Sequence, residues 1–335
     1  MTVTAIGDLA RSLTLRMANA RLTSEMDRLV EEVGTGRAAD LPKRVSGDFG
    51  PLAGIEARLG RLEGYRTATT EARGLVDTMQ GALGHVRATL QGFGAEVLAA
   101  GTNGGLQKMQ VRGDEAAERF ATAVSALNTR EAGRAVFAGT ASDGRALAPA
   151  ADMLAALEAQ VAGQTTAADV VAQVDAWFGP GGGFETMGYL GSDTPAGPLS
   201  IGSDRTLQAD VRAGDDRLRD ALRGLALGAL LDRGPLAGDA VEQARLARRA
   251  GEGMVEAETA MVDLVAEVGV MQEAITTEQT AQGAERAALE RARNEIVGID
   301  PFESASRLQE VQTRLESFYA VTARTARLSL TEYLR

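Results

Sequence analysis

Apolar residues recur at alternating spacings of three and four near both ends of the chain, over 15–33 and over 308–325. This spacing places one apolar stripe along a helix and is typical of a coiled-coil seam. It predicts two terminal helices, 1–33 and 300–335, that pair with each other. Asn19 occupies a seam position, where a polar residue often fixes the register. The predicted subunit-assembly residues are Leu15, Leu22, Met26, Leu29, Leu308, Val311, Leu315, Phe318, Leu328, Leu330 and Leu334.

The C-terminal helix has a predicted start at Asp300. An aspartate at this position can accept hydrogen bonds from the first-turn amides, Pro301 suits the first helical position, and Glu303 stands where a capping box places it. The chain then continues without Gly or Pro to an apolar end. Because chain termini are usually polar and frayed, this apolar helical end needs a partner.

Two further helical arms are predicted between the terminal helices. The stripe resumes at Ile55 and continues regularly to Val97, a turn at 101–105 follows, and a second run leads to Leu127. The segment 34–51 holds several Gly and two Pro residues and is expected to be irregular. Eight glycines lie between residues 54 and 94, and each weakens a helix by about 1 kcal/mol relative to Ala. Such a helix is expected to pack closely on its neighbours.

The return arm is predicted to be helical over 215–231 and again over 239–297. The second helix contains no proline, and about sixty helical residues would span about 90 Å, more than a compact globule needs. Its methionines between 254 and 271 favour core packing over an interface that rearranges.

The composition changes between the two arms, from residue 139 to residue 205. Four of the eight prolines and the single tryptophan lie in this segment, which we call the insert. The predicted elements are short helices over 150–160 and 167–177 and short strands near Tyr189, 199–201 and 207–211.

These elements predict a mainly α fold, in which long antiparallel helices form a rod-like coiled-coil bundle with a small mixed α/β module inserted. The expected domains are discontinuous. They are paired terminal helices (1–33 and 300–335), a helical-bundle shaft (34–138 and 206–299) and an outward-facing insert (139–205).

The composition and charge of the chain limit the classes of partner that it is expected to bind. Aromatic residues make up only 4% of the chain, which suits helices better than a β-rich core. The formal net charge of −11 argues against nucleic acid and against anionic membrane surfaces. No stretch approaches the roughly twenty apolar residues that span a bilayer, so no membrane insertion is expected. The N-terminus does not resemble a Sec signal peptide, and the lack of cysteine rules out disulfides.

Catalytic, cofactor-binding and metal-binding constellations are not predicted. The single histidine, His85, cannot build a zinc site without further imidazoles or thiolates. The Gly-rich run at 179–183 lacks the Gly-Lys-Ser/Thr of a phosphate loop, and pairs such as Asp215–Asp216 arise by chance among 46 carboxylates. We therefore expect no cofactor and no enzymatic activity.

Three motifs carry a resemblance to a known family. They are LN at 127–128 followed by VFAGT at 136–140, VRAGDD at 211–216, and the ending LSL at 328–330 with YL at 333–334. With them the chain resembles the bacterial flagellin-type axial proteins, and among these it is most similar to the hook-associated protein of the hook–filament junction. The resemblance covers most of both arms but not the insert.

This resemblance implies a structural subunit that joins the hook to the filament by helical self-assembly. It implies export through the flagellar type III channel and an extracellular place on the bacterial flagellum. The implied partners are further copies in a helical ring, another hook-associated protein on the hook side, flagellin on the filament side and an export chaperone. The terminal helices would fold on assembly.

Two alternatives remain open. One is flagellin itself, the filament subunit, against which stand the modest insert and the EYLR ending at 332–335. The other is a cytoplasmic coiled-coil scaffold or signalling protein. Such a protein would explain the seams but not the apolar last residues.

Overall fold

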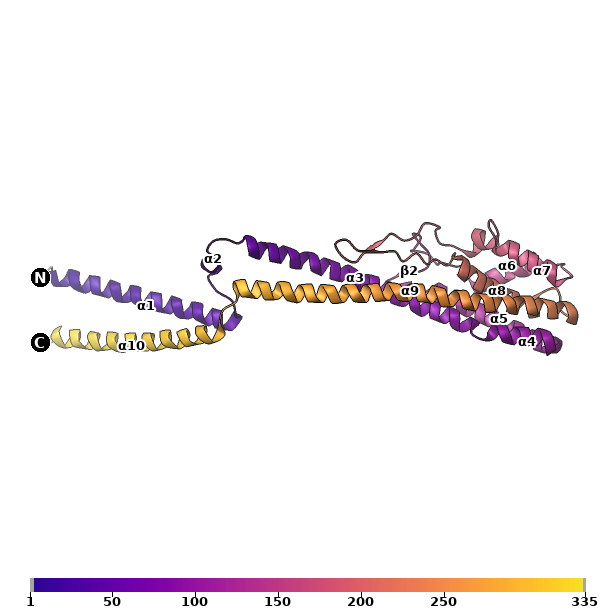
Figure 1. Cartoon of the computed structure of the whole chain (residues 1–335). Helices are drawn as coiled ribbons and strands as arrows, with labels where there is room; N and C mark the ends of the chain where they lie inside the picture. Colours follow the sequence, from indigo (N-terminus) through magenta and orange to yellow (C-terminus); the bar gives the residue numbers. More distant parts are fainter. Residues whose placement is uncertain (1–2, 334–335) are drawn as a thin grey trace. The chain divides into compact units, whose positions relative to one another are not determined.

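The computed structural model describes the backbone of residues 3–333 and the side chains of residues 10–325. Long helices dominate this part of the chain (Figure 1), which confirms the predicted mainly α fold. The helices are α1 (Val3–Thr35), α2 (Leu41–Arg44), α3 (Gly50–Leu90), α4 (Phe93–Asn103), α5 (Gly105–Leu127), α6 (Ala150–Val161), α7 (Ala167–Phe178), a π-helix η1 (Phe184–Gly188), α8 (Asp216–Arg233), α9 (Ala240–Val297) and α10 (Pro301–Tyr333). The strands are β1 (Arg130–Glu131), β2 (Arg134–Ala135), β3 (Leu199–Ser200) and β4 (Thr206–Leu207).

The chain forms two compact units. The first contains Met1–Leu62 and Gly283–Arg335, and the second contains Glu63–Gln282. The long helices α3 and α9 each contribute residues to both units. The predicted division into terminal helices, shaft and insert stays a prediction.

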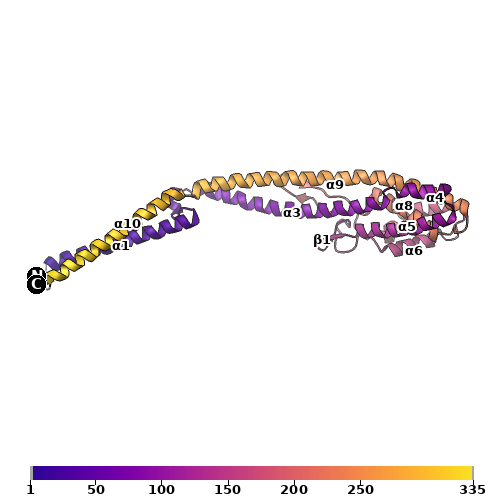
Figure 2. The ribbon, with the colours of Figure 1, turned by 90° about the horizontal axis from the view of Figure 1, so that it is seen from below.

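In the first unit, α1 and α10 lie side by side and run antiparallel (Figures 1 and 2). The turns that join them to α2 and α9 are held together by backbone pairing. The amide of Ala38 donates to the carbonyl of Val297 at 2.9 Å, and Arg37 forms an antiparallel bridge with Gly298. Asp300 caps α10, because its Oδ1 accepts the amides of Phe302 at 2.8 Å and Glu303 at 3.2 Å. The predicted start of this helix is confirmed.

The second unit has one continuous apolar core built from its long helices. Antiparallel α3 and α9 are joined at their surface by Asp77, which accepts from Gln272 at 2.6 Å, and by Arg73, which donates to Thr276 at 3.0 Å. Met254 and Met261 are fully buried in this core. The core-packing interpretation of the α9 methionines is therefore confirmed.

The helix predicted to run through Val97 is interrupted at residues 91 and 92. Gly92 has a φ of +70°, in the left-handed region that glycine adopts without a steric penalty. Its amide donates to the Glu258 carboxylate on α9 at 3.2 Å. The apolar series continues through the break because Leu90 and Phe93, on either side of it, are both buried in the same core. Periodicity alone therefore did not reveal the interruption.

Two glycines let α4 and α9 approach closely. A Cβ added at Gly251 would lie 2.7 Å from the carbonyl oxygen of Gly94, and one added at Gly94 would lie 2.9 Å from that of Gly251. The expectation of close packing is confirmed here. It is wrong for most of the glycines of α3, because a Cβ added there would meet nothing within 4 Å. These open positions are Gly54, Gly60, Gly64, Gly81 and Gly84.

Both predicted helices of the insert are present, as α6 and α7. Its strands are shorter than predicted: β3 and β4 pair antiparallel over two residues each, and Tyr189 forms only an isolated bridge with Leu147. An aromatic cluster fills the module, with Trp177 and Phe178 packed edge to face at 4.7 Å between ring centroids and Phe178 and Phe184 stacked at 5.5 Å. Asn128, just after α5, anchors the chain where it enters the insert, because its side-chain amide exchanges hydrogen bonds of 2.9 and 3.1 Å with the backbone of Leu147.

We predict opposite effects for two glycine-to-alanine substitutions. Gly251→Ala should lower the free energy of unfolding by about 1–3 kcal/mol, because the new methyl group overpacks the α4–α9 contact. Gly84→Ala, on the exposed face of α3, should raise it by about 0.5–1 kcal/mol through the lower entropy of the unfolded chain. Urea unfolding of the full chain measures both, and equal midpoints for the two variants would contradict the role of Gly251.

Candidate assembly surface

The seam between α1 and α10 has a small core of its own. Leu29, Val311 and Leu315 are 1%, 3% and 7% exposed and form one buried cluster, against which Leu22, Met26 and Leu308 pack. This cluster is separate from the core of the second unit. The structure thus brings together six of the predicted assembly residues.

The other predicted seam residues are less buried or lie outside the described side chains. Leu15 and Phe318 are half-buried. Leu328 and Leu330 belong to α10, but their side chains are outside the described part, and Leu334 lies outside the described residues altogether.

At its other end the seam stops earlier on α1 than the spacing predicts. Val33 is 39% exposed, and Glu32 is buried in its place. The Glu32 carboxylate accepts the amide of Ala39 at 3.3 Å and pairs with Arg28 at 3.4 Å. The inclusion of Val33 in the seam was wrong, because this hydrogen bond to the turn after α1 draws the neighbouring carboxylate inward.

Both helices of the pair also carry exposed apolar side chains away from the seam. On α1, Leu13 and Met17 are 52% and 53% exposed, and on α10, Tyr319 and Val321 are 54% and 59% exposed. Sequence reasoning missed these residues because they do not follow the three-and-four spacing. They are available for contacts with another chain.

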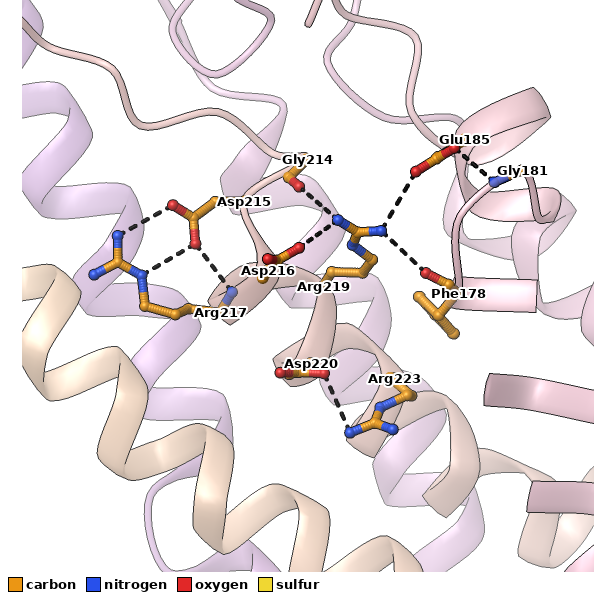
Figure 3. Close-up of polar contacts among 10 residues, drawn as sticks. All are labelled: Phe178, Gly181, Glu185, Gly214, Asp215, Asp216, Arg217, Arg219, Asp220 and Arg223. Carbon is orange, nitrogen blue, oxygen red and sulfur yellow. Dashed lines mark hydrogen bonds and ion pairs between the residues drawn. The ribbon is translucent and has the colours of Figure 1, made fainter. Parts of the chain in front are cut away.

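A polar cluster at the start of α8 fastens the insert to this helix within the second unit (Figure 3). The guanidinium of Arg219 donates to the carbonyls of Phe178 at 3.3 Å and Gly214 at 3.4 Å. It also pairs with Glu185 at 3.5 Å and with Asp216. Its side chain is 18% exposed, so one arginine joins α7, η1 and the N-terminus of α8.

Beside it, Asp215 and Arg217 connect α8 to α9. Asp215 caps α8 by accepting the amide of Arg217 at 2.9 Å, and its carboxylate also binds the guanidinium of Arg217 at 3.1 Å. Arg217 reaches the Glu267 carboxylate at 2.8 Å. The hydrogen bonds that Arg217 donates to Asp215 and then to Glu267 raise its pKa above the usual value. Asp215 and Asp216 are therefore structural, and a helix-cap analysis of the VRAGDD motif would have found the role of Asp215.

Comparison with known proteins identifies one region of the chain. Residues 252–334 match the family model of the bacterial flagellin C-terminal helical region, which covers the last part of α9 and α10. The chain therefore contains a flagellin-type C-terminal region. The resemblance drawn from the sequence motifs is thereby confirmed.

Solved structures share the fold of the chain. The FlgL protein of Bacillus cereus is 16% identical, with a TM-score of 0.51 over 70% of this chain and 96% of the other. A putative flagellar hook-associated protein from Vibrio parahaemolyticus is 13% identical, with a TM-score of 0.50 over 75% of this chain and 99% of the other. A search of curated proteins gives no match.

The residues weighed for other chemistry have structural roles or lie on the surface. His85 is exposed on α3. In the Gly-rich loop, the amide of Gly181 donates a hydrogen bond to the Glu185 carboxylate at 2.7 Å. Within the described residues there is no cluster of three metal-binding side chains, and no helix there is long and apolar enough to cross a membrane. The matches to flagellar proteins agree with the expectation that the chain is not an enzyme.

We predict that Arg219→Ala loosens the insert. The substitution removes the donors to two backbone carbonyls and leaves the Glu185 and Asp216 carboxylates without this partner, so we expect the free energy of unfolding to fall by about 1.5–3 kcal/mol. The matched control is Arg249→Ala, because Arg249 is 70% exposed and pairs with Glu252 at 3.6 Å; its loss should change stability by at most about 0.5 kcal/mol. Thermal unfolding followed by the fluorescence of Trp177 measures the difference. Equal shifts in the two variants would contradict the anchoring role.

Proposed function

We propose that the chain is a structural subunit of the bacterial flagellum, a hook-associated protein that joins hook to filament by helical self-assembly. The observation that carries the proposal is the flagellin C-terminal helical region, whose α10 packs antiparallel on α1 around a separate apolar cluster. A terminal pair with its own small core can serve assembly while the core of the second unit stays intact.

Assembly in this proposal uses two sets of side chains on the terminal pair. The seam residues hold α1 to α10, and the exposed apolar residues, among them Met17 and Tyr319, pack against neighbouring subunits. Covering each large apolar side chain contributes roughly 1.5–3 kcal/mol. In a ring of copies the free energies of these contacts add up. A helix pair that is only weakly stable in one chain is therefore stabilised in the assembly.

The junction position is the finer part of the proposal. Two solved structures with this fold are a FlgL protein and a putative hook-associated protein, and at 16% and 13% identity they support the fold alone. The modest insert at 139–205 favours a hook-associated protein over flagellin. Flagellin is the second candidate, because the matched C-terminal region is a flagellin region. The cytoplasmic scaffold has no comparable support.

The proposed surroundings follow from that position. The subunit is exported through the flagellar type III channel with a chaperone and acts outside the cell on the flagellum. It contacts copies of itself, another hook-associated protein on the hook side and flagellin on the filament side. It needs no cofactor.

We predict that Leu315→Asp abolishes assembly without unfolding the second unit. Leu315 is 7% exposed in the terminal cluster, and a carboxylate there loses its hydration without gaining a partner. In a strain that lacks its own copy, the variant should restore neither swimming nor filaments seen by electron microscopy.

The control Gln312→Asp places the same charge on an exposed position of the same helix and should restore both. Circular dichroism of the purified Leu315→Asp protein should still show the cooperative melt of the second unit. Loss of that melt would mean that the substitution acts by general unfolding.

The position on the flagellum is tested by immunogold electron microscopy of isolated flagella with an antibody against residues 139–205. We expect label in a narrow band where the hook meets the filament. Label along the whole filament would make the chain a flagellin. Unlabelled flagella, with the protein retained in the cytoplasm, would contradict the flagellar role.

A further inference from the structure

One buried polar atom interrupts the seam between α1 and α10. The side-chain oxygen Oδ1 of Asn19 is shielded from solvent and receives no hydrogen bond from the described residues. The preceding and following predicted assembly residues on α1, Leu15 and Leu22, are apolar. A buried acceptor left unpaired costs about 1–3 kcal/mol. Asn19 therefore weakens the pair to which it belongs.

The antiparallel packing of the pair places Asn19 opposite two threonines. Leu29 shares its buried cluster with Val311 and Leu315. Because Asn19 lies ten residues before Leu29 on α1, it faces the stretch ten residues after Val311 and Leu315 on α10, which is 321–325. The half-buried residues of that stretch are Thr322 and Thr325.

Each of these threonines has a hydroxyl that can donate one hydrogen bond. In the structure the Thr322 hydroxyl donates to the carbonyl of Phe318 at 2.7 Å, and the Thr325 hydroxyl donates to the carbonyl of Thr322 at 3.0 Å. Those carbonyls already belong to the hydrogen-bonding ladder of the helix, so a threonine hydroxyl can rotate away from one of them at little cost. The seam at this level therefore has an acceptor on one helix and two donors on the other.

We propose that Asn19, Thr322 and Thr325 form a polar layer that sets the register in which α1 pairs with α10. Apolar seam residues alone specify register weakly, because a shift of seven residues restores a similar set of contacts. A shift of one heptad toward the start of α10 would bury the Asn19 oxygen against Leu315 or Phe318, which have no donor. The native register is thus favoured, because the shifted register leaves the Asn19 side chain buried among apolar ones. This selectivity lowers the stability of the pair relative to a fully apolar seam.

The absence of cysteine from the chain allows a direct test of register by disulfide trapping. Met26→Cys with Leu315→Cys reports the native register, and Met26→Cys with Leu308→Cys reports a shift of one heptad, since a disulfide needs Cα atoms within about 7 Å of each other. Each pair is built in the otherwise unchanged full chain, with Asn19→Leu, and with Ala18→Leu as the control. Ala18 is a neighbouring half-buried residue, so its substitution adds apolar bulk and keeps the amide.

Mild oxidation followed by mass spectrometry of the linked peptides gives the outcome. With Asn19 present, we expect the native pair to link and the shifted pair to stay at background. With Asn19→Leu, linkage of the shifted pair should rise severalfold and the melting temperature of the uncrosslinked chain should increase. Ala18→Leu should leave the shifted pair at background.

Three results would overturn the proposal. The first is a shifted pair that stays at background with Asn19→Leu, whatever happens to the melting temperature. The second is an equal rise with Ala18→Leu, which would make the effect one of apolar bulk. The third is failure of the native pair to link, when Asn19 is present, in subunits assembled on the flagellum, where the terminal helices are expected to be folded.

Discussion

The apolar stripe of each long helix is covered by a helix from a distant part of the sequence, and the rest of the structure depends on that constraint. The apolar stripe of α1 is covered by α10, and that of α3 packs against α9. The α3–α9 pairing runs within the first unit as well, where Glu56 and Arg293 meet at 3.7 Å. A single helix with an apolar stripe is marginally stable in water. The antiparallel return of the chain therefore has to bring the matching stripes together.

Polar groups decide where the paired helices begin, where the terminal seam ends and how the insert is attached. Asp300 and Asp215 satisfy the first amides of α10 and α8, so each helix starts at a defined residue. Arg219 binds carbonyls and carboxylates from three segments and holds the insert on α8. Glu32 ends the terminal seam by turning toward the amide of Ala39. These contacts add little net energy compared with the apolar cores, but they exclude alternative arrangements of helices that are otherwise chemically similar.

This difference between the two units suits a chain with a flagellin-type C-terminal region. The second unit has a large core of its own, whereas the core of the terminal pair is small, and both helices of the pair carry exposed apolar residues. Apolar surface of that kind favours association with other copies. The match to the flagellin C-terminal region covers α10 and also the part of α9 that buries Met254 and Met261 in the core of the second unit. The matched region therefore contributes both to the terminal pair and to the larger core.

The sequence by itself determined the elements and most of the terminal seam. The helix expected over 239–297 is found as Ala240–Val297, the cap at Asp300 is in place, and Leu29, Val311 and Leu315 are buried together. These features follow from local rules of spacing and capping that need no knowledge of the neighbours. Only the tertiary structure decided the break at Gly92, the exchange of Val33 for Glu32, the partners of Arg219, and which glycines lie at a helix contact. Each of these depends on an atom supplied by a distant segment, and no spacing along the chain records which segment that is.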